Sequence, residues 1–150
     1  MTADDGGLFG SLRAKFVKPV TAALKRPARI LLVDDEPSIL YFAERALGQA
    51  GYQVSVAGSG AEALQIAEAA DPFDLLLTDV VMPPINGDEL ARQMRRLTPG
   101  IKVLYLTGYS DNIFADRTML WEDEAFVEKP CSVEALLQAV SLLLSGHTGS

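Results

Sequence analysis

The sequence predicts an α/β fold, a three-layer sandwich in which five helices cover both faces of a five-stranded parallel sheet. Five short runs of β-branched residues and leucine are bounded by polar or turn-forming residues, which is the pattern of strands buried on both faces. Segments with helical apolar spacing lie between these runs, and this alternation favours right-handed crossovers. A chain of 150 residues is long enough for one domain of ordinary size with its own core.

The first half of the body has clear boundary signals. Pro37 stands where a first helical turn begins, a position at which its missing N–H loses no partner, and Gly51 closes that helix. Asp71-Pro72 stops the next helix, which is rich in alanine. The predicted strands are residues 30–33 and 53–57, and the predicted helices are residues 38–50 and 60–70.

The second half begins with the central strand, an apolar run that ends abruptly in Asp79. Pro99-Gly100 ends the helix that follows, and Ser132 caps the last helix, which has a continuous apolar face. The segment 110–124 lacks a clear apolar stripe, so its helix is the weakest of the five. The predicted strands are residues 74–78, 102–106 and 124–127, and the predicted helices are residues 88–97, 111–120 and the segment after Ser132.

The net charge of −7 hides an asymmetry along the chain. Residues 1–29 hold six basic and two acidic side chains, whereas the remainder holds seven basic and eighteen acidic ones. We therefore divide the chain into an amphipathic basic arm or linker (1–28), a folded body (29–146) and a loose tail (147–150). An acidic body argues against general nucleic-acid binding.

Targeting signals are not evident in the sequence. The opening MTADDGG carries acids where a signal peptide carries positive charge, and no apolar segment reaches the roughly 20 residues that a membrane span needs. The single cysteine, Cys131, excludes an internal disulfide and fits a reducing compartment. We therefore expect a cytoplasmic location.

The basic arm leaves two interpretations open. Leu12, Phe16, Val20 and Leu24 recur at helical spacing beside basic residues, although Pro19 interrupts the pattern. The arm is then either a linker or helix that docks on the body or on a second copy, giving a homodimer, or a surface helix that contacts an anionic membrane or an acidic partner.

Five chemically useful side chains follow strand ends, which meet at one edge of a parallel sheet: Asp34, Asp35, Asp79, Thr107 and Lys129. Carboxylates brought together repel one another unless a cation joins them, and Mg²⁺ suits an oxygen site with one or two carboxylates, a carbonyl and waters. Asp79 would then attack with its free oxygen. Lys129 and Thr107 suit the negative charge of a transferring phosphoryl group, and Gly108 leaves room for its approach.

These residues resemble the receiver domains of two-component response regulators. The motifs are VDDE at 33–36, LLLTDVVMPPINGDEL at 75–90, YLTG at 105–108 and FVEKP at 126–130. The resemblance implies a flavodoxin-like sheet of order 2-1-3-4-5 and a signalling switch instead of an enzyme that turns over substrate. It makes Asp79 the phosphoacceptor and gives Mg²⁺ to Asp34, Asp35, Asp79 and the Val81 carbonyl. Thr107 becomes the switch hydroxyl, Phe126 the switch aromatic, Lys129 the phosphate-binding lysine and Pro130 a cis-proline.

Two departures from the family pattern affect the expected behaviour. Val81 stands where rapidly dephosphorylating receivers carry a polar residue that orients water, and Tyr109 is large enough to screen the acyl phosphate, so we expect slow dephosphorylation. Pro84 stands where the family often has glycine and stiffens the loop after Asp79.

The resemblance implies a histidine protein kinase or a histidine phosphotransfer protein as phosphoryl donor, docking near Pro37, Ser38, Ile39, Phe42 and the Pro130-Cys131 turn. We expect no output domain within the 150 residues, so the chain is either a switch acting through protein contacts or a phosphate shuttle or sink. Two other functions stay open: an interaction module with an inactive site, and a haloacid-dehalogenase-like aspartyl phosphatase. The phosphatase is disfavoured because its nucleophile would follow the first strand in a D-x-D pattern, whereas Asp34 and Asp35 are adjacent.

Overall fold

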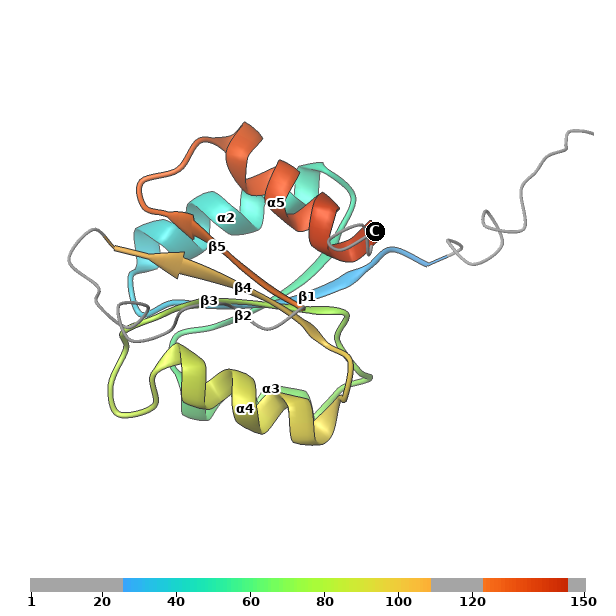
Figure 1. Ribbon diagram of the computed structural model, residues 1–150, viewed down its shortest axis with the longest axis vertical. Coiled ribbons are helices and arrows are strands. Elements are labelled where there is room, and N and C mark those ends of the chain that lie inside the picture. The colour runs from blue at the N-terminus through green and yellow to red at the C-terminus, as the bar shows by residue number, and fades with distance from the viewer. Residues whose placement is uncertain (1–25, 109–122, 146–150) are drawn as a thin grey trace, which may run out of the picture.

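The computed structural model describes residues 26–108 and 123–145. Its five strands form one parallel sheet of order β2-β1-β3-β4-β5, as predicted (Figure 1). The strands are β1 (Arg29–Val33), β2 (Gln53–Ala57), β3 (Leu75–Asp79), β4 (Lys102–Thr107) and β5 (Glu124–Glu128). The helices are α2 (Pro37–Gln49), α3 (Gly60–Ala69), α4 (Gly87–Leu97) and α5 (Val133–Ser145).

The predicted fold class is therefore confirmed, with four helices in the described part of the chain. The predicted helix over 111–120, the basic arm up to residue 25 and the tail from residue 146 lie outside the described residues. Three strands, β3, β4 and β5, end one residue later than predicted, because Asp79 stays in register with Leu106 and Thr107 with Glu128. No helix in the described ranges is long and apolar enough to cross a membrane.

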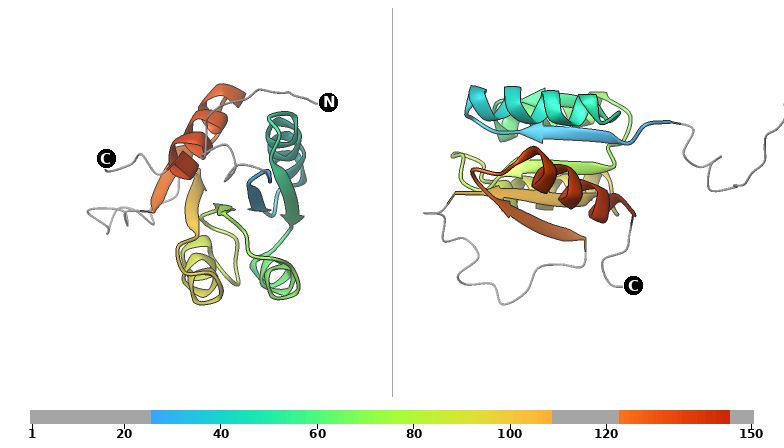
Figure 2. Two further views of the ribbon diagram at one scale, coloured as in Figure 1. Left: turned by 90° about the vertical axis from the view of Figure 1, so that its right-hand side faces the viewer. Right: turned by 90° about the horizontal axis from the view of Figure 1, so that it is seen from above.

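The helices form two layers, with α2 and α5 on one face of the sheet and α3 and α4 on the other (Figures 1 and 2). Successive strand residues point to opposite faces, so one apolar run supplies both layers. Ile30 and Leu32 pack with α2 and α5, whereas Leu31 and Val33 pack with α3 and α4. This double burial explains why the strands read as continuous apolar runs without polar alternation.

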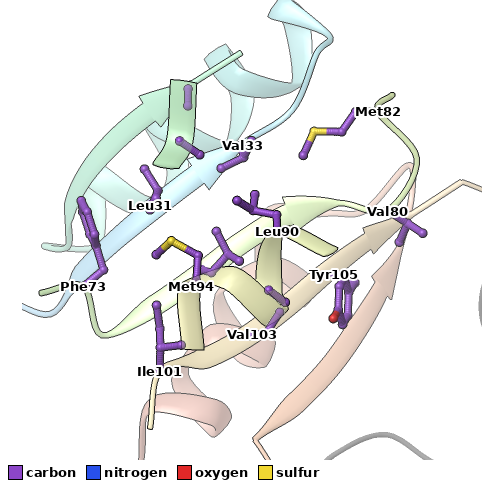
Figure 3. Packing of buried hydrophobic residues seen from close by; sticks show 14 residues of the cluster. Leu31, Val33, Phe73, Val80, Met82, Leu90, Met94, Ile101, Val103 and Tyr105 are labelled. Atoms are coloured by element: carbon purple, nitrogen blue, oxygen red, sulfur yellow. The ribbon is translucent and has the colours of Figure 1, made fainter. Parts of the chain in front are cut away.

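The cluster under α3 and α4 combines strand residues with the inward face of α4 (Figure 3). Leu90 and Met94 of α4 are fully buried against Leu31 and Val103 of the sheet. Among the described residues, Tyr105 is the largest fully buried side chain, and it lies in the same cluster. Packing of this kind fixes α4, whose first residue follows the loop after β3.

The loop between β3 and α4 is held by main-chain contacts. The Gly87 N–H donates to the Val80 carbonyl at 2.8 Å, and the Met82 N–H donates to the Asn86 side-chain oxygen at 2.9 Å. A Cβ on Gly87 would lie only 2.2 Å from the Asp79 carbonyl oxygen. A side chain at residue 87 would therefore collide with the backbone of the residue that ends β3.

We predict that Gly87→Ala lowers the free energy of unfolding by at least about 2 kcal/mol, because the methyl group overpacks rigid backbone. Gly48→Ala is the matched control, since a Cβ on this α2 residue meets nothing within 4 Å. The control should gain about 0.5–1 kcal/mol from its better helix propensity. Urea unfolding of both variants measures the difference, and equal stabilities would contradict the close approach at Gly87.

Candidate functional site

The carboxyl ends of the strands bring the predicted polar residues to one edge of the sheet. Asp34 directly follows β1, and Asp79 and Thr107 are the last residues of β3 and β4. Lys129 directly follows β5, and its N–H donates to the Thr107 carbonyl at 2.8 Å. Backbone pairing thus fixes where each side chain starts, as expected for a parallel sheet.

Three carboxylates meet at this edge. Asp34, Asp35 and Asp79 each offer an oxygen, and these oxygens all lie within 4.8 Å of one another. Asp34 is fully buried and Asp79 is 6% exposed, whereas Asp35 is exposed to solvent. Two acids of this cluster are therefore buried, and the third faces water.

The two oxygens of Asp34 have different surroundings. Oδ1 accepts a hydrogen bond from the Glu36 N–H at 2.9 Å. Oδ2 is buried without a hydrogen bond, and the Lys129 ammonium lies 3.0 Å from it as an ion pair. A buried carboxylate oxygen with unused lone pairs is a suitable ligand for a hard cation.

Lys129 lies between the acids. Its Nζ is 3.0 Å from Asp34 Oδ2, 3.4 Å from Asp79 Oδ1 and 3.5 Å from Glu36 Oε1. The Lys129-Pro130 peptide bond is cis, as the resemblance implies. A single ammonium group thus neutralises part of the charge that three strand ends concentrate.

Burial and mutual repulsion alter the acidity of these groups. Burial, followed by repulsion from Asp34, raises the pKa of Asp79 to about 6. Burial also raises the pKa of Asp34, against the lowering effects of the Glu36 N–H and Lys129. Burial lowers the pKa of Lys129, but its two carboxylate neighbours outweigh this and raise the pKa overall. The negative charges of Asp34 and Asp79 are therefore unfavourable at this site, and a bound cation would stabilise them.

The donor set fits Mg²⁺, which prefers hard oxygen ligands and few protein carboxylates. Asp34, Asp35 and Asp79 supply the oxygens, and Asp34 Oδ2 has the unused capacity. Val81 lies in the loop directly after β3 with a 44% exposed side chain. The role of its carbonyl as a further ligand stays a prediction.

The two predicted switch residues differ in exposure. Thr107 is 6% exposed, whereas Phe126 is 50% exposed on β5. Phe126 is the register partner of the buried Tyr105 on β4. The aromatic side chain therefore lies partly in solvent, and its predicted inward turn would be a change from this position.

Several features of the site were not assigned from the sequence. Glu36 received no role, although it continues the acidic run after β1 and its side chain contacts Lys129. The Pro83-Pro84 peptide bond is also cis. Tyr109, predicted to screen the acyl phosphate, lies outside the described residues.

An apolar pocket of about 190 Å³ lies beside Lys129. Four of its lining residues belong to the predicted docking face or its turn: Ile39, Phe42, Pro130 and Cys131. Burial raises the pKa of the Cys131 thiol, against smaller lowering effects of its own backbone and Lys129. The pocket wall is thus neutral apart from the lysine that also reaches the acids.

Comparison with known proteins identifies two kinds of relative: a sensor kinase much longer than the matching region, and a receiver protein that the match almost fills. The chain is 37% identical over 122 residues to the sensor kinase CckA of Brucella abortus, covering 81% of this chain but only 13% of the kinase. It is 34% identical to the response regulator receiver protein CpdR of the same organism, covering 77% of this chain and 96% of CpdR.

A solved structure of a receiver protein is also similar to this chain. The response regulator receiver protein of Sinorhizobium medicae WSM419 superposes with a TM-score of 0.71 at 32% identity, over 79% of this chain and 95% of that one. The family model "Response regulator receiver domain" matches residues 30–141, which include every acid and the lysine described above. The chain therefore belongs to the response regulator receiver family of two-component signalling.

Proposed function

We propose that this protein accepts a phosphoryl group on Asp79 from a phosphohistidine of a histidine protein kinase or histidine phosphotransfer protein, and acts as a conformational switch. The observation that carries the proposal is the cluster of Asp34, Asp35 and Asp79 with Lys129 between two of them. Family membership supports a signalling role over catalytic turnover.

In the proposed reaction, a carboxylate oxygen of Asp79 attacks the phosphorus of phosphohistidine in line with the leaving nitrogen. The P–N bond breaks, its electron pair returns to the imidazole, and an acyl phosphate forms. Lys129 stays near the negative charge that passes to the phosphoryl oxygens, and the Thr107 hydroxyl donates to one of them. Asp34, Asp35, Asp79 and the Val81 carbonyl would hold Mg²⁺, which when bound would supply positive charge opposite the phosphoryl oxygens.

The proposed partner docks over the apolar pocket beside Lys129. Ile39 and Phe42 of α2 and the Pro130-Cys131 turn supply an apolar contact. A phosphohistidine presented there meets Lys129, which borders both the pocket and the acid cluster. Hydrophobic contact then supplies affinity while the acids supply the chemistry.

We further propose that residues 29–146 form the receiver unit, with a cytoplasmic location, and that residues 147–150 are a tail. Residues 1–28 then have two candidate roles: docking on the body or on a second copy, which would give a homodimer, or contact with an anionic membrane or acidic partner. Output passes through protein contacts, or the phosphoryl group moves on to another histidine as in a shuttle or sink.

Replacing the nucleophile tests the acceptor. The unchanged protein should show saturable, Mg²⁺-dependent binding of beryllofluoride by calorimetry and Trp121 fluorescence, and Asp79→Asn should abolish it. Glu44→Gln, which removes the same charge from an exposed position on α2, should bind normally. Stoichiometric labelling without turnover of p-nitrophenyl phosphate agrees with the proposal. Sustained turnover would favour the phosphatase, and absence of binding by the unchanged protein would favour an inactive module.

A second prediction follows from the raised pKa of Asp79. Because the folded pKa of about 6 exceeds the ordinary value of 3.8 for an aspartate, ionised Asp79 destabilises the fold above pH 6, and this penalty disappears below about pH 4. Asp79→Asn should therefore raise the free energy of unfolding at pH 7.5 by about 2 kcal/mol in EDTA, and by almost nothing at pH 4. Excess Mg²⁺ should shrink the gain at pH 7.5, and Glu44→Gln should change stability little at either pH. A gain that is larger at pH 4 would contradict the pKa shift.

A third prediction concerns the lifetime of the phosphoryl group. Val81 cannot orient water, so Val81→Asn should speed dephosphorylation about tenfold or more, as measured by loss of phosphoryl label from the purified protein. Val133→Asn makes the same exchange at an exposed position on α5 and should leave the rate unchanged. A half-life of seconds in the unchanged protein would refute the slow rate expected from Val81 and Tyr109.

A further inference from the structure

A carboxylate is buried far along the sheet from the acid cluster. Glu124, the first residue of β5, is 6% exposed although it lies on an edge strand. Its Oε2 accepts a hydrogen bond from the Tyr105 hydroxyl of β4 at 3.2 Å and forms an ion pair with Arg95 of α4. One buried carboxylate therefore joins two strands and a helix, an arrangement that needs its partners because an unpaired buried charge is unfavourable.

These three residues, which we call the Arg95–Glu124–Tyr105 network, adjoin the predicted switch residues. Side chains two apart on a strand share one face, so Glu124 lies on the face of Phe126 and Tyr105 on the face of Thr107. Tyr105 and Phe126 are also register partners on neighbouring strands. The network thus holds the strand pair at the residues two positions before Thr107 and Phe126.

The Tyr105 ring fills the space beside the sheet on this face. It is fully buried in the cluster under α3 and α4, where Figure 3 shows it next to Val103 and Val80, whereas Phe126 is half exposed. Because the two side chains are register partners on the same face, an inward turn of Phe126 would bring its ring toward the Tyr105 ring. The Tyr105 hydroxyl donates to Glu124, so a shift of this ring would disturb that contact.

We propose that Tyr105 and Glu124 are positioning residues for the phosphoryl-acceptor switch: together with Arg95 they hold β5 and α4 in the unphosphorylated arrangement. The inference rests on the proposed function for its link to phosphorylation. A ligand that selects the inward state binds more weakly in proportion to the rarity of that state. Weakening the network therefore makes the inward state more populated and tightens the binding of a phosphoryl analogue.

The test uses Tyr105→Phe in the full chain, which removes the hydroxyl and keeps the ring. Beryllofluoride with Mg²⁺ should bind this variant about tenfold more tightly, a change of 1.4 kcal/mol in binding free energy. Lys102→Met is the matched control: Lys102 Nζ lies 3.0 Å from Asp123 Oδ1, so this pair also links β4 to the chain just before β5, but it is partly exposed and includes no residue of the network. The control should change the affinity less than twofold.

A second variant guards against a folding defect. Arg95→Met combined with Glu124→Leu removes the buried pair and replaces it with apolar volume, an exchange that often preserves stability. This double variant should also bind beryllofluoride more tightly. A folded Tyr105→Phe or double variant with unchanged or weaker affinity would overturn the proposal, because a purely structural role alters stability and leaves this affinity unchanged.

Hydrogen exchange without beryllofluoride separates this inference from the proposed function. The Lys129 N–H, bonded to the Thr107 carbonyl at 2.8 Å, reports on the end of β5. Its exchange should accelerate about tenfold in Tyr105→Phe and stay unchanged in Lys102→Met. If neither the variant nor the unchanged protein bound beryllofluoride, the phosphoacceptor role would be refuted. If the exchange of the Lys129 N–H were unchanged in Tyr105→Phe, the role of the network would be refuted whatever the result for beryllofluoride.

Discussion

The ion pairs of Lys129 offset the repulsion between the buried acids, and the rest of the site depends on them. Strand ends force Asp34 and Asp79 together out of water, where each raises the free energy of the other's charged form. An ammonium group within 3.4 Å of both offsets part of that repulsion, and its position depends on the β4–β5 pairing that carries the lysine backbone. The sheet core and the strand register therefore also determine the charge balance of the site. A change in either would move Lys129 and leave the acids unpaired.

The fold and the acid cluster were predictable because they depend on local patterns. Apolar runs that end in Asp34, Asp79 and Thr107 determine both the strands and the edge where their polar residues meet. Pro37 and Ser132 mark helix starts through backbone chemistry that needs no tertiary information. Three strands ended one residue later than predicted, because ladder pairing with a neighbour, and not composition, decides where a strand stops.

Other features depend on contacts between distant segments and could not be predicted. Arg95 and Glu124 are 29 positions apart, and nothing in the β5 sequence shows that its first acid is buried. The half-exposed state of Phe126 depends on what fills the space beside Tyr105. Glu36 was visible as part of an acidic run, but only the structure brings it to Lys129.

The close approach of Gly87 to the Asp79 carbonyl has a consequence for how this site can diversify. The backbone of Asp79, the proposed phosphoacceptor, packs closely against Gly87, so the side chains of the intervening loop do not position it. Val81, Pro83 and Pro84 all face solvent in this loop. Substitutions at these three positions can therefore alter the proposed partner contacts and the lifetime of the proposed phosphoryl group while the backbone geometry of Asp79 stays unchanged.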